Sequence, residues 1–172
     1  MIEENKRENI REEIVRATEA RRAAELLFNN DFIKDAVSKL YYFLLYSIRA
    51  LLFTKGLEPK SHEGALRLLG LHFVKEGLFI SQDSHVFSKL MKFREEADYN
   101  PSYVFTPLES HAFQSGDEVV FRFGYLSERA GFKAPSLLTG FTKEDFNDLA
   151  READDLFLKI KAYLKEKEYL IE

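Results

Sequence analysis

Arg94 and Asp98 stand four positions apart near the end of a predicted helix, and this spacing places both side chains on one helix face. On a solvent-facing surface such an ion pair stabilises a helix by only a few tenths of a kcal/mol. The same face, however, continues toward the start of the helix as an apolar stripe of Phe87, Leu90 and Met91. We therefore expect Arg94 and Asp98 to face the helical bundle or an interface, where charges are costly unless paired and are often functional. A structural ion pair and a functional site are equal alternatives at this point.

A second polar group precedes another predicted helix and consists of Lys60, Ser61 and His62. Ser61 is suited to N-cap that helix, and a capped loop is the simpler interpretation. The alternative is a ligand-binding group in which Lys60 and His62 add positive charge to the surface around Arg94.

A third group lies on the most apolar helix and consists of Tyr41, Tyr42, Tyr46 and Arg49. Spacings of four and three place Tyr42, Tyr46 and Arg49 on one face. The simpler interpretation is core tyrosines beside an arginine whose charged end extends to solvent. The alternative is that Tyr42 and Arg49 bind a ligand together with Arg94.

Sequence motifs for cofactors and metals are absent. The chain has neither G-x-G-x-x-G nor G-x-x-x-x-G-K-[ST], the glycine-rich patterns that hold nucleotide phosphates. It has no H-E-x-x-H, and its four histidines, at positions 62, 72, 85 and 111, lack metal-ligand spacing. No G-x-S-x-G nucleophile motif is present. We therefore expect no metal and no cofactor.

The composition is typical of a protein from a reducing compartment. Cysteine is absent from the 172 residues, which excludes disulfides and thiolate metal sites. Residues 1–20 are too charged for a signal peptide, and no apolar run approaches the ~20 residues that a membrane span needs. We expect a cytoplasmic location without membrane contact. The net charge of -4 argues against a chain that coats nucleic acid by bulk electrostatics, while leaving room for a local basic patch.

Hydrophobic periodicity predicts about five helices within one domain that spans residues 1–172. The expected helices cover residues 5–28, 32–55, 62–76 and 81–99, and the last begins after Thr142. The helix 32–55 is apolar on most sides, which is typical of a central helix packed by several neighbours. Short turns between long helices favour antiparallel pairs. The predicted fold class is all-α, an up-and-down helical bundle.

Capping residues mark two of the predicted boundaries. Residues 29–31, Asn-Asn-Asp, form a turn cluster that can end the first helix and N-cap the second. The last helix has the clearest start, because Thr142 is placed as its N-cap and Asp145 completes an imperfect capping box. Phe141 and Phe146 stand where a hydrophobic staple requires apolar residues.

Residues 100–140 differ from the rest of the chain, because they hold three prolines, four glycines and a high share of phenylalanine. They predict a long irregular insertion before the last helix. Val119, Phe121, Phe123 and Tyr125 alternate with other residues and indicate one short strand or an extended arm. A segment of this length is too long for an idle connection, so we expect it to pack on its own bundle or on a partner.

Taken together, these segments resemble the HEPN superfamily, and within it the group of small proteins called UPF0332. The resemblance covers residues 8–99 and, more loosely, the last helix. Its most specific parts are Ala36 with Tyr41-Tyr42, Arg49-Ala50-Leu51-Leu52, Lys60-Ser61-His62, and Arg94 with Ala97-Asp98-Tyr99. The resemblance implies a helical bundle that forms homodimers. It also implies a minimal nucleotidyltransferase as a candidate partner, because some members stand beside one, often as a toxin with its antitoxin.

Many members of that family cut RNA without a metal, using an Arg that is followed four to six residues later by His. The resemblance aligns Arg94 with that Arg, but the residue five positions later is Tyr99, and no His follows before Pro101. A Tyr with an ordinary pKa near ~10 is a poor substitute for His as a general base near neutral pH. Arg94 and Tyr99 are therefore the candidate catalytic residues of an altered motif, and the change favours binding over catalysis.

Three functions are compatible with these patterns. The first is a dimeric binding module for a nucleotide, an RNA segment or a partner nucleotidyltransferase, in a system of the toxin–antitoxin type. Its candidate ligand-binding residues are Arg94, Asp98, Arg49, Tyr42, Lys60, Ser61 and His62. The second is an altered ribonuclease in which Arg94 stabilises the phosphate and His62 moves protons. The third is a non-catalytic structural or regulatory subunit whose segment 100–140 wraps around a partner.

Overall fold

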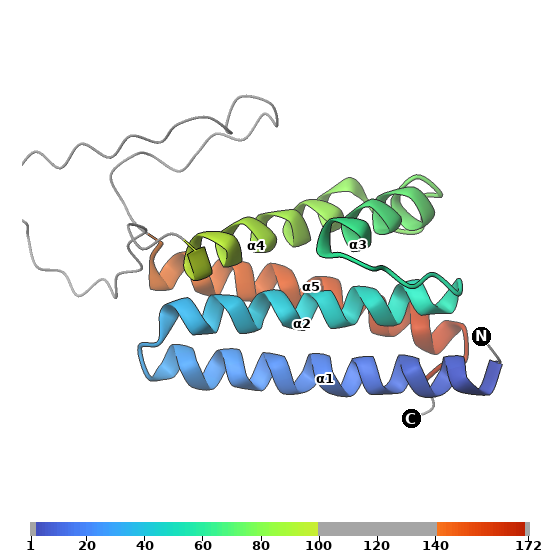
Figure 1. Ribbon diagram of the computed structural model, residues 1–172, viewed down its shortest axis with the longest axis horizontal. Helices are drawn as coiled ribbons and strands as arrows, with labels where there is room; N and C mark the ends of the chain where they lie inside the picture. The colour runs from blue at the N-terminus through green and yellow to red at the C-terminus, as the bar shows by residue number, and fades with distance from the viewer. Residues whose placement is uncertain (1–2, 100–140, 171–172) are drawn as a thin grey trace, which may run out of the picture.

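The computed structural model describes residues 3–99 and 141–170, and these residues confirm the predicted all-α class (Figure 1). The α-helices are α1 (Glu3–Asn29), α2 (Ile33–Thr54), α3 (His62–Leu69), α4 (Ser81–Tyr99) and α5 (Lys143–Glu166). In Figure 1, α1 and α4 run in one direction and α2 and α5 in the other, as an up-and-down bundle requires. The strand or arm expected at residues 119–125, and the rest of the segment 100–140, lie outside the described residues.

α1 and α2 form the antiparallel hairpin that their lengths and short connection predict. The chain reverses at Asp31, whose φ of 63° places it in the left-handed region that Asp tolerates better than most residues. The prediction that residues 29–31 supply the N-cap of α2 was wrong. The N-cap is Phe32, without a side-chain cap, because Asp31 is used for the reversal and its carboxylate lies 2.5 Å from Lys143 Nζ of α5.

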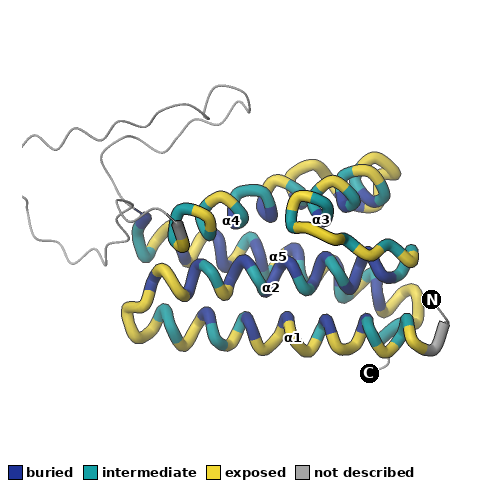
Figure 2. The backbone as a smooth tube through the Cα atoms, viewed as in Figure 1, coloured by how far each residue is buried: buried dark blue, intermediate teal, exposed yellow. Residues whose placement is uncertain are grey.

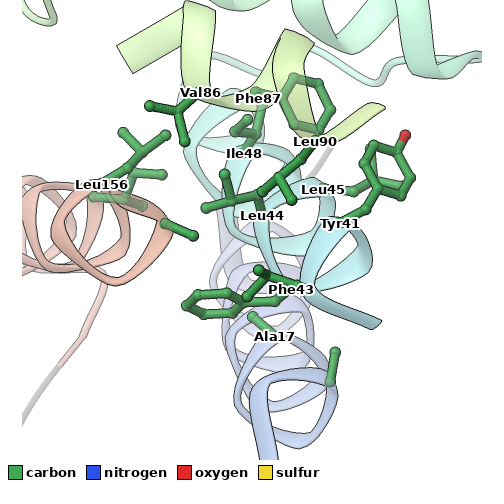
Figure 3. Packing of buried hydrophobic residues seen from close by; sticks show 14 of the residues in the cluster. Ala17, Tyr41, Phe43, Leu44, Leu45, Ile48, Val86, Phe87, Leu90 and Leu156 are labelled. Carbon is green, nitrogen blue, oxygen red and sulfur yellow. The ribbon is translucent and has the colours of Figure 1, made fainter. Parts of the chain in front are cut away.

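α2 is the central helix and contacts α1, α3, α4 and α5. Its side chains are buried on most sides, as the dark colour of its trace shows (Figure 2), and they form the middle of the apolar core (Figure 3). Among the helices of the described residues, only α2 is long and apolar enough to cross a membrane. However, 72% of its most apolar stretch is buried inside the bundle. The apolar character of α2 is thus accounted for by core packing.

The helix predicted at residues 62–76 is divided into α3 and a π-helical turn, η1 (Gly70–Val74). Ser61 caps its start as predicted, because the Ser61 hydroxyl accepts a hydrogen bond from the Gly64 N–H at 3.0 Å. The extra residue in the turn rotates the chain, so that Phe73 is fully buried while Leu71 is 48% exposed. His62 is the first residue of α3, directly after the Ser61 cap, so the start of this helix fixes its position.

The start of α5 is held by a complete capping box, which is stronger than the imperfect one expected. The Thr142 hydroxyl accepts from the Asp145 N–H at 3.1 Å, and the Asp145 carboxylate accepts from the Thr142 N–H at 2.8 Å. Phe141 and Phe146 are both buried, and their rings pack on Phe93 and Phe28. These contacts join α5 to α4 and α1 beside the end of α4, where Arg94 lies.

Candidate functional site

Arg94 and Asp98 form the ion pair that their spacing predicts, with 2.6 Å between Arg94 Nε and Asp98 Oδ2. The Arg94 side chain is only 14% exposed and faces the bundle, whereas Asp98, whose side chain is 30% exposed, lies at its solvent edge. The guanidinium carbon of Arg94 lies 5.9 Å from the ring centroid of Tyr41 and 6.0 Å from that of Tyr42. These distances allow a cation–π attraction to both rings, which holds the guanidinium over α2.

His62 reaches the same two tyrosines from α3. Its ring centroid lies 5.4 Å from that of Tyr41 and 6.4 Å from that of Tyr42, edge to face in the second case. The pKa of His62 is lowered from its ordinary value of 6.5, first by burial and then by the positive charge of Arg94. Arg49 lowers this pKa further, and the carboxylate of Glu95 opposes the shift. His62 is therefore mostly neutral at pH 7 and can accept a proton.

The ring of Tyr41 lies beneath both Arg94 and His62. It is fully buried, and its ring stacks on Phe87 of α4 with 5.6 Å between centroids and 9° between planes. Figure 3 shows its oxygen pointing away from the labelled apolar side chains of α2 and α4. The hydroxyl has no hydrogen-bond partner among the described residues, and burial raises its pKa, so it is protonated at neutral pH.

From the sequence, Tyr41 belonged to the third polar group and to the family resemblance, but it was not among the candidate ligand-binding residues. The signal was the residue type itself, because a phenylalanine would fill the same apolar position without burying a hydroxyl. We call Arg94, Asp98, His62, Tyr41 and Tyr42 the Arg94 site.

Arg49 points toward α1, where its Nη2 lies 3.2 Å from Oε1 of Glu13. The Glu13 side chain is 4% exposed, and Arg16 also approaches the same oxygen at 3.4 Å. Burial raises the pKa of Glu13, while Arg49 and Arg16 act in the opposite direction. Glu13 was missed from the sequence, although it stands three residues after Ile10 and four before Ala17 on the buried stripe of α1. Arg49 of α2 thus forms an ion pair with Glu13 of α1. Its charge still lies close enough to His62 to lower the pKa of that residue.

The remaining candidate residues lie at the rim of the Arg94 site or outside the description. Lys60 and Ser61 are exposed just before α3, and the Ser61 hydroxyl is engaged in the helix cap. Tyr46 stacks on Tyr42 one turn further along α2, with 5.9 Å between ring centroids. Tyr99 is the last residue of α4, and its side chain lies outside the described part. Within residues 3–99 and 141–170, His, Asp and Glu side chains form no group of three suited to a metal ion.

Comparison with known proteins places this arrangement in a family. The model of the HEPN domain matches residues 10–121, which include all the residues of the Arg94 site. This chain belongs to the HEPN domain family. The match extends beyond the range 8–99 expected from sequence and takes in the first half of the segment 100–140.

Related proteins include two from Methanocaldococcus jannaschii, each carrying the name "putative toxin". The first is 38% identical over 99 residues, which cover 58% of this chain and 74% of that protein. The second is 33% identical over 87 residues, which cover 51% of this chain and 59% of that protein. A UPF0332 protein of Pyrococcus horikoshii is 42% identical over 55 residues, 32% of this chain and 39% of that protein. This HEPN domain is thus similar to proteins named UPF0332 and to proteins named putative toxin.

Proposed function

We propose that this HEPN domain is a toxin-like protein that binds RNA through a backbone phosphate at the Arg94 site. The observation that carries the proposal is the convergence of Arg94 from α4 and His62 from α3 on the two adjacent tyrosines of α2. These residues come from α2, α3 and α4, which are separate in sequence, so the cluster forms only when the helices pack together. Relatives named as toxins support the direction of the proposal.

The chemistry of Arg94 suits a phosphate oxygen. A guanidinium binds carboxylate and phosphate through the same planar arrangement of donors, and in this structure it already pairs with a carboxylate, that of Asp98. A phosphate oxygen can therefore replace the carboxylate of Asp98 as the partner of Arg94. The partly exposed ring of Tyr42 offers an aromatic surface for a base, as is usual in recognition of single-stranded RNA.

The test measures binding of a fluorescein-labelled single-stranded RNA by fluorescence anisotropy. Arg94→Ala should weaken binding about 10- to 100-fold, the loss expected for charge-assisted hydrogen bonds. Arg151→Ala is the matched control, because Arg151 lies exposed on α5 and pairs only at the surface with Asp148. Equal affinities of Arg94→Ala and Arg151→Ala would refute the site. Unlabelled AMP and a purified minimal nucleotidyltransferase serve as competitors, and displacement by either one would point to that ligand class instead.

A homodimer is part of the proposal, because the family resemblance implies that two copies pair. Light scattering of the purified protein gives its mass in solution, and a monomer at micromolar concentration would contradict this part.

His62 supports a second candidate function, a metal-independent ribonuclease. A neutral imidazole near Arg94 can accept the proton of a ribose 2′-hydroxyl as that oxygen bonds to phosphorus. The bond between phosphorus and the 5′ oxygen then breaks, and the departing oxygen takes a proton from water. Incubation of RNA with the protein and EDTA should yield 2′,3′-cyclic phosphate ends, and His62→Ala should abolish them. Intact RNA in both reactions would leave binding as the function.

A further inference from the structure

Tyr41 carries a hydroxyl that the packing of the core does not use. The side chain is fully buried, yet its oxygen has no hydrogen-bond partner in the described part of the chain. Buried hydroxyls are nearly always hydrogen-bonded, because their removal from water is otherwise uncompensated. A phenylalanine at this position would keep the stacking on Phe87 without that cost. The hydroxyl therefore requires an acceptor that residues 3–99 and 141–170 do not provide.

The direction of the hydroxyl indicates where that acceptor would lie. The oxygen points away from the apolar side chains labelled in Figure 3. Arg94 and His62 both lie within 6 Å of the same ring, measured from the guanidinium carbon and from the imidazole centroid. The unsatisfied hydroxyl thus lies on the side of Tyr41 that faces Arg94 and His62, where the proposed RNA phosphate is bound.

We infer that the Tyr41 hydroxyl donates a hydrogen bond to the phosphoryl oxygen that Arg94 binds, and that the Arg94 site selects a phosphodiester. The inference rests on the proposed function and adds a residue and a ligand class to it. The oxygen of Tyr41 is covered in the unliganded protein, and it becomes accessible as Arg94 turns from Asp98 toward the phosphate. Burial keeps the hydroxyl protonated, which preserves it as a donor at neutral pH.

The charges around Tyr41 favour a phosphodiester over a phosphomonoester. At neutral pH the site presents the cation Arg94, the neutral His62 and the neutral Tyr41, with the carboxylate of Asp98 beside them. Arg49 also acts on His62, but its charge is paired with Glu13. A single internucleotide charge can be matched by Arg94 and by neutral donors. A monoester with nearly two charges would face Asp98 and Glu95, the latter close enough to influence His62. The site is therefore suited to the backbone of an RNA chain and not to its terminal phosphate.

The test compares Tyr41→Phe, Arg94→Ala and the control Tyr163→Phe in binding of labelled single-stranded RNA at several salt concentrations. Tyr163 is a suitable control because its ring packs on Phe73 and Phe79, away from the Arg94 site. Tyr41→Phe should weaken binding about 3- to 10-fold, as expected for a neutral hydrogen bond. It should leave the slope of log affinity against log salt unchanged, whereas Arg94→Ala should reduce the slope by about 0.7, the value for one phosphate contact. The melting temperature of Tyr41→Phe should equal or exceed that of the wild type, and AMP should compete poorly.

Each result has a defined consequence. Wild-type affinity of Tyr41→Phe beside weak binding of Arg94→Ala would overturn this inference and leave the proposed function intact. Wild-type affinity of both variants would overturn both. A lower melting temperature together with weaker binding would assign Tyr41 a structural role and overturn the inference. Competition by AMP as strong as that by an unlabelled dinucleotide would overturn the phosphodiester preference.

Discussion

The Nε atom of Arg94 lies 2.6 Å from Oδ2 of Asp98, one turn further along α4, and the arginine side chain is only 14% exposed. An ion pair in this position does two things. It neutralises a cation that would otherwise be partly buried without a counterion, and it places a carboxylate where an anionic ligand would pair with the guanidinium. Asp98 therefore competes with the proposed phosphate for Arg94.

This competition predicts that Asp98→Asn binds labelled single-stranded RNA about 3- to 10-fold more tightly than the wild type. The amide removes one negative charge from the site and loosens the hold on Arg94, while the side chain keeps its size. Asp148→Asn is the matched control, because Asp148 pairs with Arg151 on the exposed surface of α5. Weaker binding by Asp98→Asn would show instead that Asp98 orients Arg94 for the ligand.

His62 should titrate below its ordinary pKa of 6.5, because burial and the charge of Arg94 both disfavour the imidazolium. NMR titration of the imidazole resonances measures this directly. Arg94→Ala should move the pKa of His62 upward, toward 6.5, because the larger of the two charge effects that lower it is removed. A pKa of His62 that does not change in this variant would mean that Arg94 and His62 are not coupled.

The same lowered pKa gives a pH dependence of folding. The unfolded chain binds a proton at His62 more readily than the folded chain, so stability from this residue is present above pH 6.5 and declines as the pH falls through the folded pKa. Urea unfolding followed by circular dichroism between pH 7.5 and 5 should show this decline, and His62→Gln should reduce its slope. An unchanged slope in His62→Gln would assign the decline to other groups.

The fold was predictable from the sequence because each helix carries its own pattern of apolar spacing and its own boundary residues. Ser61 and Thr142 cap the helices at which they were placed, and both act through neighbours three residues away. The turn at Asp31 was less predictable, since the same residue type serves as a cap or as a left-handed residue, and tertiary packing decides between them.

The site was only partly predictable, because it depends on how the helices pack. The Arg94–Asp98 pair follows from spacing along one helix. His62 was proposed as a proton carrier because the family resemblance calls for a histidine and the motif itself lacks one. The partnership of Arg49 with Glu13 joins residues of two helices and could not follow from spacing within either. The unsatisfied hydroxyl of Tyr41 is a property of its surroundings, which only the packed structure reveals.

Thr142→Ala should lower the free energy of unfolding by about 1 kcal/mol, the typical cost of losing an N-cap side chain. The hydroxyl of Thr142 accepts from the Asp145 N–H, and this variant leaves that donor without its partner. Urea unfolding of the variant measures the loss. Thr18→Ala is the control, because its hydroxyl bonds only to the Ile14 carbonyl within α1, and its cost should be near zero. Equal costs in the two variants would show that the box does not hold the start of α5.

The pair of Glu13 and Arg49 should be costly to break from one side. Arg49→Met leaves a carboxylate that is 4% exposed with Arg16 as its remaining partner, at 3.4 Å. We expect a loss of about 3 kcal/mol in the free energy of unfolding at pH 7, the low end for a broken buried pair. The double variant Glu13→Leu/Arg49→Met should recover most of that loss, because it removes the stranded charge and places two apolar side chains between α1 and α2.

The pH dependence of Arg49→Met separates charge from packing. Removal of Arg49 raises the pKa of Glu13 further above its ordinary 4.5, because Arg49 is the larger of the two cationic influences that lower it. A raised folded pKa gives stability that is present below pH 4.5 and is lost as the pH rises through the folded value. The deficit of Arg49→Met relative to the wild type should therefore be largest at pH 7 and smallest near pH 4, as measured by urea unfolding at both values. A deficit of the same size at both pH values, persisting in the double variant, would mean that Arg49 stabilises the fold through the packing of its stem and not through Glu13.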